Sequence, residues 1–202
     1  MDARSARKHQ SILEAATEVF LSRGYAGTSM DDIARLAAVS KQTVYKHFAD
    51  KEKLFAEIVL ATTDGIDGMI DAVADIPVDA AGLEDGLLRL ARRFTVTLTQ
   101  THVLQLRRLI IANADQFPEL GATWYERGFE RVLANLADTF RRLADAGLLR
   151  IDDPLLAAHH FAGLLLWIPV NKAMFHGSAQ HDDTDLERYA TEGVRVFLAA
   201  YR

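Results

Sequence analysis

The stretch Thr28–Phe48, TSMDDIARLAAVSKQTVYKHF, carries two short helix signals separated by a tight turn. Thr28 and Ser29 each stand three residues before an aspartate, a spacing in which a hydroxyl oxygen caps a helix and the acid completes a capping box. Residues 37–39 form the expected turn, and Ser40 is the expected cap of the second helix. Two short helices joined so closely predict a helix-turn-helix.

The second of these helices has one apolar side and one side rich in hydrogen-bond donors. Val44 and Phe48 lie four residues apart and therefore point the same way, into a core. The residues left outside are Lys41, Gln42, Thr43, Tyr45, Lys46 and His47. Because the second helix of a helix-turn-helix enters the DNA major groove, we expect DNA binding at this face. The alternative is a solvated charged surface.

Lysines at two expected helix starts support the same interpretation. Lys41 and Lys51 each occupy a first helical position, where a positive charge opposes the helix dipole. Since phosphates bind at helix N-termini, we interpret both lysines as phosphate-binding.

The chain of 202 residues carries a net charge of −5 that is unevenly distributed. Residues 1–60 hold nine Lys and Arg against eight Asp and Glu, a balance of +1, whereas the remainder holds fourteen against twenty, a balance of −6. This favours a small DNA-facing part carried by a larger acidic part, which we place at residues 1–50 and 51–202. The absence of cysteine excludes a disulfide framework, and with the polar N-terminus it favours the cytoplasm.

The segment before the helix-turn-helix predicts a further helix, which completes a three-helix domain. Gly24 is placed to end this helix. The apolar residues that follow helical spacing are Ile12, Ala15, Ala16, Val19 and Phe20. Ahead of them we expect a basic arm that either touches DNA or is a frayed terminus, formed by Arg4, Arg7 and Lys8.

Residues 24–55, GYAGTSMDDIARLAAVSKQTVYKHFADKEKLF, resemble the N-terminal signature of the TetR family of bacterial transcriptional regulators. The resemblance covers about residues 10–57 and follows the family's order and spacing. It implies an all-α homodimer with a helix-turn-helix domain and a C-terminal helical domain for effector binding and dimerisation. It also implies repression, with release from a palindromic operator by a small hydrophobic effector.

The resemblance assigns roles to the DNA-facing residues. It makes Lys41, Gln42 and Lys46 candidates for base contacts. The candidates for phosphate contacts are Thr28, Ser29, Thr43, Tyr45, His47 and Lys51, and Tyr45 can also reach a thymine methyl group. Ser40 is a further DNA-binding candidate. Two residues depart from the family's common glycines: Ala38 predicts a turn without positive φ, and Gln42 is a possible adenine reader.

The C-terminal part predicts further helices, which bring the total to about nine. We expect a single long helix over residues 51–74, in which Gly65 and Gly68 mark either a hinge or loose packing. The other expected helices cover residues 82–101, 102–114, 118–146, 154–176 and 184 onward.

The last two helices carry more apolar surface than one domain needs, which allows either an internal core or a two-fold interface. We prefer an interface in which Gly193 permits close approach of two copies. The expected interface residues are Leu164, Leu186, Tyr189, Gly193 and Phe197.

An effector pocket is expected mainly from the resemblance, and core packing is the alternative for each candidate. The candidate lining residues are His102, Leu106, Asn113, Trp124, Phe129, Phe161, Trp167, Asn171 and Phe175.

Other classes of function are weakly represented. No phosphate loop, zinc-protease motif or nucleophile elbow occurs, so we expect neither an enzyme nor a cofactor. A metal site at His159, His160, His176 or residues 181–183 is disfavoured, because adjacent helical histidines point about 100° apart. A helical ligand carrier that no longer binds DNA is the alternative function. Such a carrier would be expected to lose the outward lysines, Thr43 and Tyr45, which are present.

Overall fold

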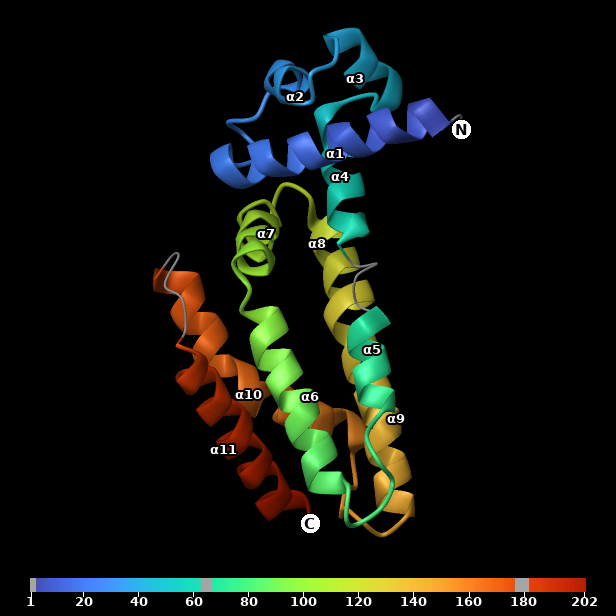
Figure 1. Cartoon of the computed structure of the whole chain (residues 1–202), viewed down its shortest axis with the longest axis vertical. Coiled ribbons are helices and arrows are strands. Elements are labelled where there is room, and N and C mark those ends of the chain that lie inside the picture. Colours follow the sequence, from blue (N-terminus) through green and yellow to red (C-terminus); the bar gives the residue numbers. More distant parts are fainter. Residues whose placement is uncertain (1–2, 63–66, 177–181) are drawn as a thin grey trace. The chain divides into compact units, whose positions relative to one another are not determined.

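The computed structural model describes residues 3–62, 67–176 and 182–202, and its regular elements are helical, which confirms the all-α prediction (Figure 1). The chain divides into two compact units. The first unit comprises Met1–Asp64 and Gln105–Trp124, and the second comprises Gly65–Leu104 and Tyr125–Arg202. None of the helices in the described ranges combines the length and apolar character needed to cross a membrane.

The first unit is built on the helices that the N-terminal sequence predicts. They are α1 (Ala3–Arg23), α2 (Met30–Leu36), α3 (Lys41–His47) and α4 (Lys51–Ala61), joined by residues of α7 (Thr101–Ala112) and by α8 (Pro118–Trp124). The predicted stripe of α1 is buried against the helix-turn-helix. The expected basic arm is instead the first turns of α1, because the helix already begins at Ala3.

Side-chain caps fix where the short helices begin. Ser29 accepts a hydrogen bond from the backbone N–H of Asp32, and Ser40 accepts one from the N–H of Thr43 at 3.1 Å. Thr28 does not cap α2, because its hydroxyl donates to the carbonyl of Gly24 at 2.7 Å. These caps account for two helices of seven residues, a length too short to be stable alone.

The turn of the helix-turn-helix corrects one prediction. Ala38 has φ of 52°, in the left-handed region that glycine adopts more readily, although its side chain led us to expect a turn without positive φ. The turn still forms because flanking backbone groups hold it, including the bond from the N–H of Val39 to the carbonyl of Ala34 at 3.0 Å.

We expect Ala38→Gly to raise the free energy of unfolding of the first unit by up to about 1 kcal/mol, because it relieves the left-handed strain. Urea unfolding followed by far-UV circular dichroism measures the change. Ala26→Gly, at an exposed position outside the left-handed region, is the control and should not stabilise the protein. A destabilised Ala38→Gly variant would contradict the assignment of strain to this turn.

The expected single helix over residues 51–74 is described as two helices, α4 and α5 (Asp67–Ala74). Gly65 lies outside the described residues. Gly68 lies beside α6, because a Cβ added there would lie 2.9 Å from the Nη2 of Arg93, the mobile end of a long side chain. The helix expected over 118–146 is continuous through α8, η2 (Tyr125–Glu130) and α9 (Arg131–Asp145), with η2 in π-helical form. The functional boundary near residue 50 stays a prediction, since the two units are defined by packing alone.

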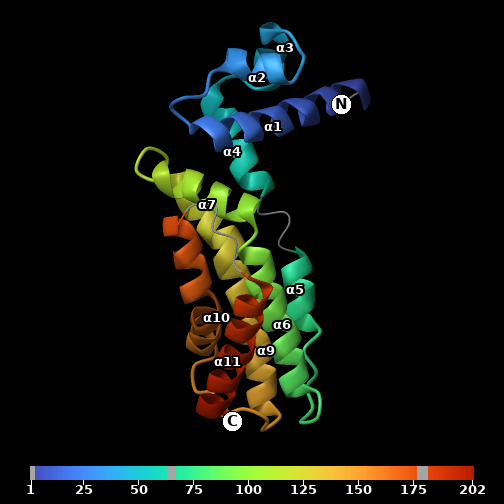
Figure 2. The ribbon, with the colours of Figure 1, turned by 60° about the vertical axis from the view of Figure 1, so that its left-hand side comes forward.

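In the second unit, α6 (Leu83–Leu98), α9, α10 (Pro154–His176) and α11 (Asp183–Tyr201) surround one apolar core (Figures 1 and 2). Phe197 lies at its centre, with ring centroids 4.9 Å from Phe140 and 5.1 Å from Phe161. Phe94 extends this aromatic cluster, 6.5 Å from Phe161. The four phenylalanines thus come from four helices and hold them together.

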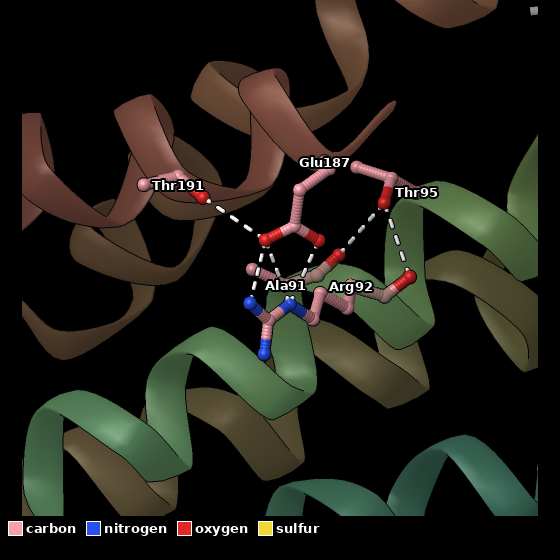
Figure 3. Close-up of polar contacts among 5 residues, drawn as sticks. All are labelled: Ala91, Arg92, Thr95, Glu187 and Thr191. Atoms are coloured by element: carbon pink, nitrogen blue, oxygen red, sulfur yellow. Dashed lines mark hydrogen bonds and ion pairs between the residues drawn. The ribbon is translucent and has the colours of Figure 1, made fainter. Parts of the chain in front are cut away.

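A charged contact on the surface of the second unit joins α6 to α11 (Figure 3). The Nε of Arg92 donates to both carboxylate oxygens of Glu187, at 3.0 and 2.8 Å, and Thr191 donates to the same carboxylate. The hydrogen bond from Arg92 is the main cause that lowers the pKa of Glu187 below its ordinary value.

This pair predicts a small pH dependence of stability. Because the pKa of Glu187 is lower in the folded state, its contribution to stability is present above the unfolded pKa and is lost as the pH falls through the folded pKa. Arg92→Met should therefore flatten the dependence of the unfolding free energy on pH on the acid side. Urea titrations at several acidic pH values, with the surface variant Arg89→Met as control, measure it. An unchanged acid-side slope would contradict the assignment.

Candidate nucleic-acid interface

The face of α3 is exposed as the sequence predicts. Val44 and Phe48 are buried, at 0% and 2% exposure, and hold the helix against the rest of the first unit. Tyr45 remains 45% exposed although it is aromatic. The other exposed candidates are Ser29, Ser40, Lys41, Gln42 and Lys46, whereas Thr43 and His47 are half-buried. Most of the predicted donors are therefore exposed on the second helix of the helix-turn-helix, the helix that in this motif enters the major groove.

Thr28 does not belong to this surface. Its side chain is buried, at 4% exposure, and its hydroxyl is bonded to Gly24. The structure contradicts the predicted phosphate contact of this side chain. Its hydroxyl donates to a carbonyl in the connection between α1 and α2, so the donor that a phosphate would need is occupied.

Lys41 is paired within the protein. Its Nζ lies 2.8 Å from the Oδ1 of Asp31 and 3.0 Å from the Oδ2. Both side chains remain more than half exposed, at 58% and 55%. The carboxylate thus offsets the unfavourable position of this lysine at a helix start, which we had attributed to phosphate alone.

Lys51 also has internal partners. Its Nζ donates to the carbonyls of Tyr25 and Thr28, each at 2.9 Å, and lies 4.3 Å from the centroid of the Tyr25 ring. An ammonium has three donors, so one remains for a phosphate. The main role of Lys51 in the structure is to fasten the connection between α1 and α2 to the start of α4.

Lys51→Met should lower the free energy of unfolding of the first unit by about 1–3 kcal/mol, because two carbonyls lose a charged donor. Urea unfolding measures the loss. Lys53→Met, on the exposed side of the same helix turn, is the matched control and should change stability little. Equal stability of the two variants would show that the Lys51 contacts are not formed in solution.

A histidine pair joins three helices of the first unit: His47 ends α3, His9 belongs to α1, and His9 contacts Glu57 of α4. The Nε2 of His9 lies 2.5 Å from the Oε1 of Glu57, and its ring stacks on Phe48 with centroids 4.6 Å apart. His47 lies 5.6 Å from the His9 ring. Burial, followed by the charges of His9, Lys46 and Lys8, lowers the pKa of His47, which favours the neutral ring at neutral pH. The sequence did not indicate this cluster, because His9 and Glu57 are far apart along the chain.

The candidate effector residues do not all belong to one compact unit. They are divided between the units: Leu106, Asn113 and Trp124 belong to the first, and His102, Phe129, Phe161, Trp167, Asn171 and Phe175 to the second. Trp167 and Phe175 are 72% and 85% exposed, and Phe161 is buried in the aromatic core. A pocket lined by these residues stays a prediction, because periodicity does not distinguish a core face from a surface face on a helix that is apolar all round.

The side-chain amides among these candidates donate hydrogen bonds to nearby backbone carbonyls. The side chain of Asn113 donates to the carbonyl of Leu109, and that of Asn171 donates to the carbonyl of Trp167, each at 2.7 Å. Such bonds to the preceding helical turn occupy a donor that a ligand would otherwise use.

Some of the predicted dimer residues are buried inside the chain, and others are at least partly exposed. Leu186 and Phe197 are buried inside one chain, at 8% and 0% exposure. The close approach at Gly193 occurs within the chain, since an added Cβ would lie 2.6 Å from the Cδ2 of Leu165 on α10. For these three residues the core alternative is therefore correct in the monomer. Tyr189 is half-buried, and Leu164 is 40% exposed.

A different apolar surface remains on the last two helices. Large side chains that are at least 40% exposed follow one another along α10 with helical spacing, and Val196 adds to them from α11. They include Leu156, Leu164, Trp167, Ile168 and Phe175. We refer to these six residues as the α10 surface.

Within the described ranges, no group of three or more histidines or carboxylates is placed to hold a metal ion. His181, one of the histidines considered above, lies outside those ranges.

Comparisons with known proteins match both the N-terminal and the C-terminal part of the chain. The family model for bacterial regulatory proteins of the tetR family matches residues 12–58, and the model for the C-terminal domain of AefR-like transcriptional repressors matches residues 85–202. Some curated relatives, up to 55% identical, match over only about a quarter of their length. The transcriptional repressor AcnR of Corynebacterium efficiens is 30% identical over 153 residues, which are 74% of this chain and 73% of AcnR.

Solved structures of other proteins align with nearly the whole chain. A TetR-family transcriptional regulator from Mesorhizobium loti is 52% identical, with a TM-score of 0.89 and 99% of each chain covered. The flavonoid-responsive regulator FrrA is 31% identical, with a TM-score of 0.75 and 98% of each chain covered. With both domain models matched and relatives aligned along its length, the chain belongs to the TetR family of bacterial transcriptional regulators.

Proposed function

We propose that this protein is a homodimeric repressor that acts in the cytoplasm, binds a palindromic operator and leaves it when a small hydrophobic effector binds. The observation that carries the proposal is the exposed face of α3. Val44 and Phe48 hold α3 through its buried side, which leaves the exposed donors of the opposite side available to a major groove.

The bases are read by Gln42, Lys46 and Lys41 in this proposal. Glutamine pairs with adenine and lysine with guanine at the major-groove edge. Tyr45, with an exposed ring and hydroxyl, meets a phosphate or a thymine methyl group. Ser29, Ser40, Thr43 and His47 complete the phosphate contacts, and Lys51 contributes its remaining donor.

A second copy of the chain covers the α10 surface. Exposed apolar side chains gathered on one face are typical of protein interfaces, and Trp167 and Phe175 are far more exposed than a monomer would favour. A two-fold dimer presents two α3 helices, which explains a palindromic operator. Leu164 and Tyr189 of the predicted set remain interface residues, whereas Leu186, Gly193 and Phe197 support the interface from within the chain.

The effector binds the C-terminal domain. FrrA is a flavonoid-responsive regulator, and this supports a small organic effector here. The effector lowers operator affinity if it binds more tightly to a state of the dimer that fits the operator poorly. A coupling free energy of about 1–3 kcal/mol suffices for a roughly 5- to 150-fold change in operator affinity. The protein has no catalytic role in this scheme.

A binding-site selection from a pool of random-sequence DNA tests the proposal. The wild-type chain should recover an inverted repeat whose half-sites are about one helical turn or a multiple of it apart. Tyr45→Ala should recover no shared motif. In light scattering after gel filtration, Trp167→Ser combined with Phe175→Ser should shift the dimer to monomer. A folded wild-type dimer that recovers no motif would contradict the proposal and favour the ligand carrier.

A further inference from the structure

Two adjacent acids at the start of α2 have different surroundings. Asp32 is largely buried, with 18% of its side chain exposed, and Arg23 and Arg35 lie 3.2 and 3.0 Å from its Oδ1. It also receives a hydrogen bond from the hydroxyl of Ser29. Asp32 therefore completes the helix cap, and its charge is balanced by two guanidinium groups.

Asp31 instead contacts α3, the second helix of the helix-turn-helix. Its carboxylate holds the Nζ of Lys41 through both oxygens, and its side chain is 55% exposed. A carboxylate at this place is unexpected on a surface that approaches phosphates, because like charges repel. The hydrogen bond to the Oδ2 occupies one of the three ammonium donors of Lys41, so Lys41 can hold Asp31 and still donate to another acceptor.

The ion pair between Asp31 and Lys41 affects two kinds of DNA complex differently. In a sequence-independent complex, the lysine gains most by turning to a phosphate, and Asp31 opposes this by holding the ammonium and by repelling the phosphate. In the operator complex, a free donor of Lys41 can reach a guanine edge while the hydrogen bond to the carboxylate is kept. Asp31 therefore weakens the sequence-independent complex more than the operator complex.

We propose that Asp31 is a positioning residue for operator recognition, which directs Lys41 away from phosphates and so raises the preference for the operator over other DNA. This inference rests on the proposed function, because it assigns α3 to the major groove. It concerns selectivity and does not require Asp31 itself to touch DNA.

The test compares Asp31→Asn, Lys41→Ala and the double variant with the wild type. Fluorescence anisotropy gives dissociation constants for the operator recovered by selection and for a scrambled duplex, at several salt concentrations. Asp31→Asn should tighten binding to the scrambled duplex by roughly 2- to 30-fold. The variant breaks one exposed ion pair in each chain of the dimer, and each freed lysine can then bind a phosphate. Its affinity for the operator should change less, so the ratio of the two constants falls.

Two further variants separate positioning from a general effect of charge. Glu18→Gln removes an exposed charge from α1 and should leave the ratio unchanged. Asp31→Glu restores a carboxylate and should restore much of the ratio. In the Lys41→Ala background, Asp31→Asn should no longer lower the ratio, because the positioned group is absent.

The outcomes are distinguishable. Wild-type protein that binds both duplexes equally would overturn the proposed function. Wild-type protein that prefers the operator, with the same preference in Asp31→Asn, would overturn this inference alone. Loss of preference that persists equally in the Lys41→Ala background would also overturn it, because Asp31 would then act without Lys41. Circular dichroism melting of each variant confirms that all are folded.

Discussion

Phe197→Ala is expected to lower the free energy of unfolding of the second unit by about 3–5 kcal/mol. Phe197 is fully buried and lies between the rings of Phe140 and Phe161, so its removal leaves a cavity where three aromatic side chains meet. Urea unfolding at fixed protein concentration, followed by far-UV circular dichroism, measures the loss.

The neighbouring residue provides the control. Val196 is 40% exposed on the α10 surface, so Val196→Ala should cost little core stability and should instead weaken dimer formation. Gel filtration with light scattering measures the second effect. The opposite pattern, with a stable Phe197→Ala variant that dissociates, would show that Phe197 lies between copies and not inside one chain.

Gln42→Ala is expected to reduce operator affinity by roughly 30-fold to 10⁴-fold. A bidentate contact from glutamine to adenine provides about 1–3 kcal/mol of discrimination, and a dimer makes it twice, so the loss is about 2–6 kcal/mol at a factor of ten per 1.4 kcal/mol. Affinity for scrambled DNA should change little, because Gln42 carries no charge. Anisotropy titrations with both duplexes separate the two quantities.

Gln116→Ala is the matched control, because this glutamine is exposed in the same unit but lies outside the helix-turn-helix. It should bind both duplexes as the wild type does. If Gln42→Ala weakened binding to both duplexes equally, the side chain would act on the backbone of the DNA and not on a base.

The helix-turn-helix could be predicted from the sequence because its determinants are local. Ser29 and Ser40 cap helices within three residues, and Val44 and Phe48 lie one turn apart. Such short-range relations survive in the structure with the spacing that the sequence gives them. The exposure of Lys41, Gln42 and Tyr45 follows from the same periodicity.

Features that depend on distant partners could not be predicted in this way. The carbonyls that hold Lys51 belong to Tyr25 and Thr28, more than twenty residues earlier. Gly193 contacts a helix of the same chain, whereas its sequence context fits a contact between chains equally well. On α10, apolar residues occur on all sides, so periodicity did not separate buried Phe161 from exposed Trp167.

The left-handed Ala38 shows a different limit. A residue type reports only a preference, and the cost of about 1–2 kcal/mol for a left-handed alanine is small beside the packing of the helices on either side. The turn geometry is therefore set by the helices that it joins, not by the residue that occupies it.

Fluorescence anisotropy on the DNA directly upstream of the protein's own gene, against a scrambled duplex at two salt concentrations, tests the assignment of α3 as the DNA-reading element most directly. We expect the wild type to prefer the upstream fragment, binding to weaken as salt rises, and Tyr45→Ala to lose the preference while it remains folded. Equal affinity of wild type and Tyr45→Ala for a fragment that the wild type clearly prefers would contradict the assignment, because another surface would then read the DNA.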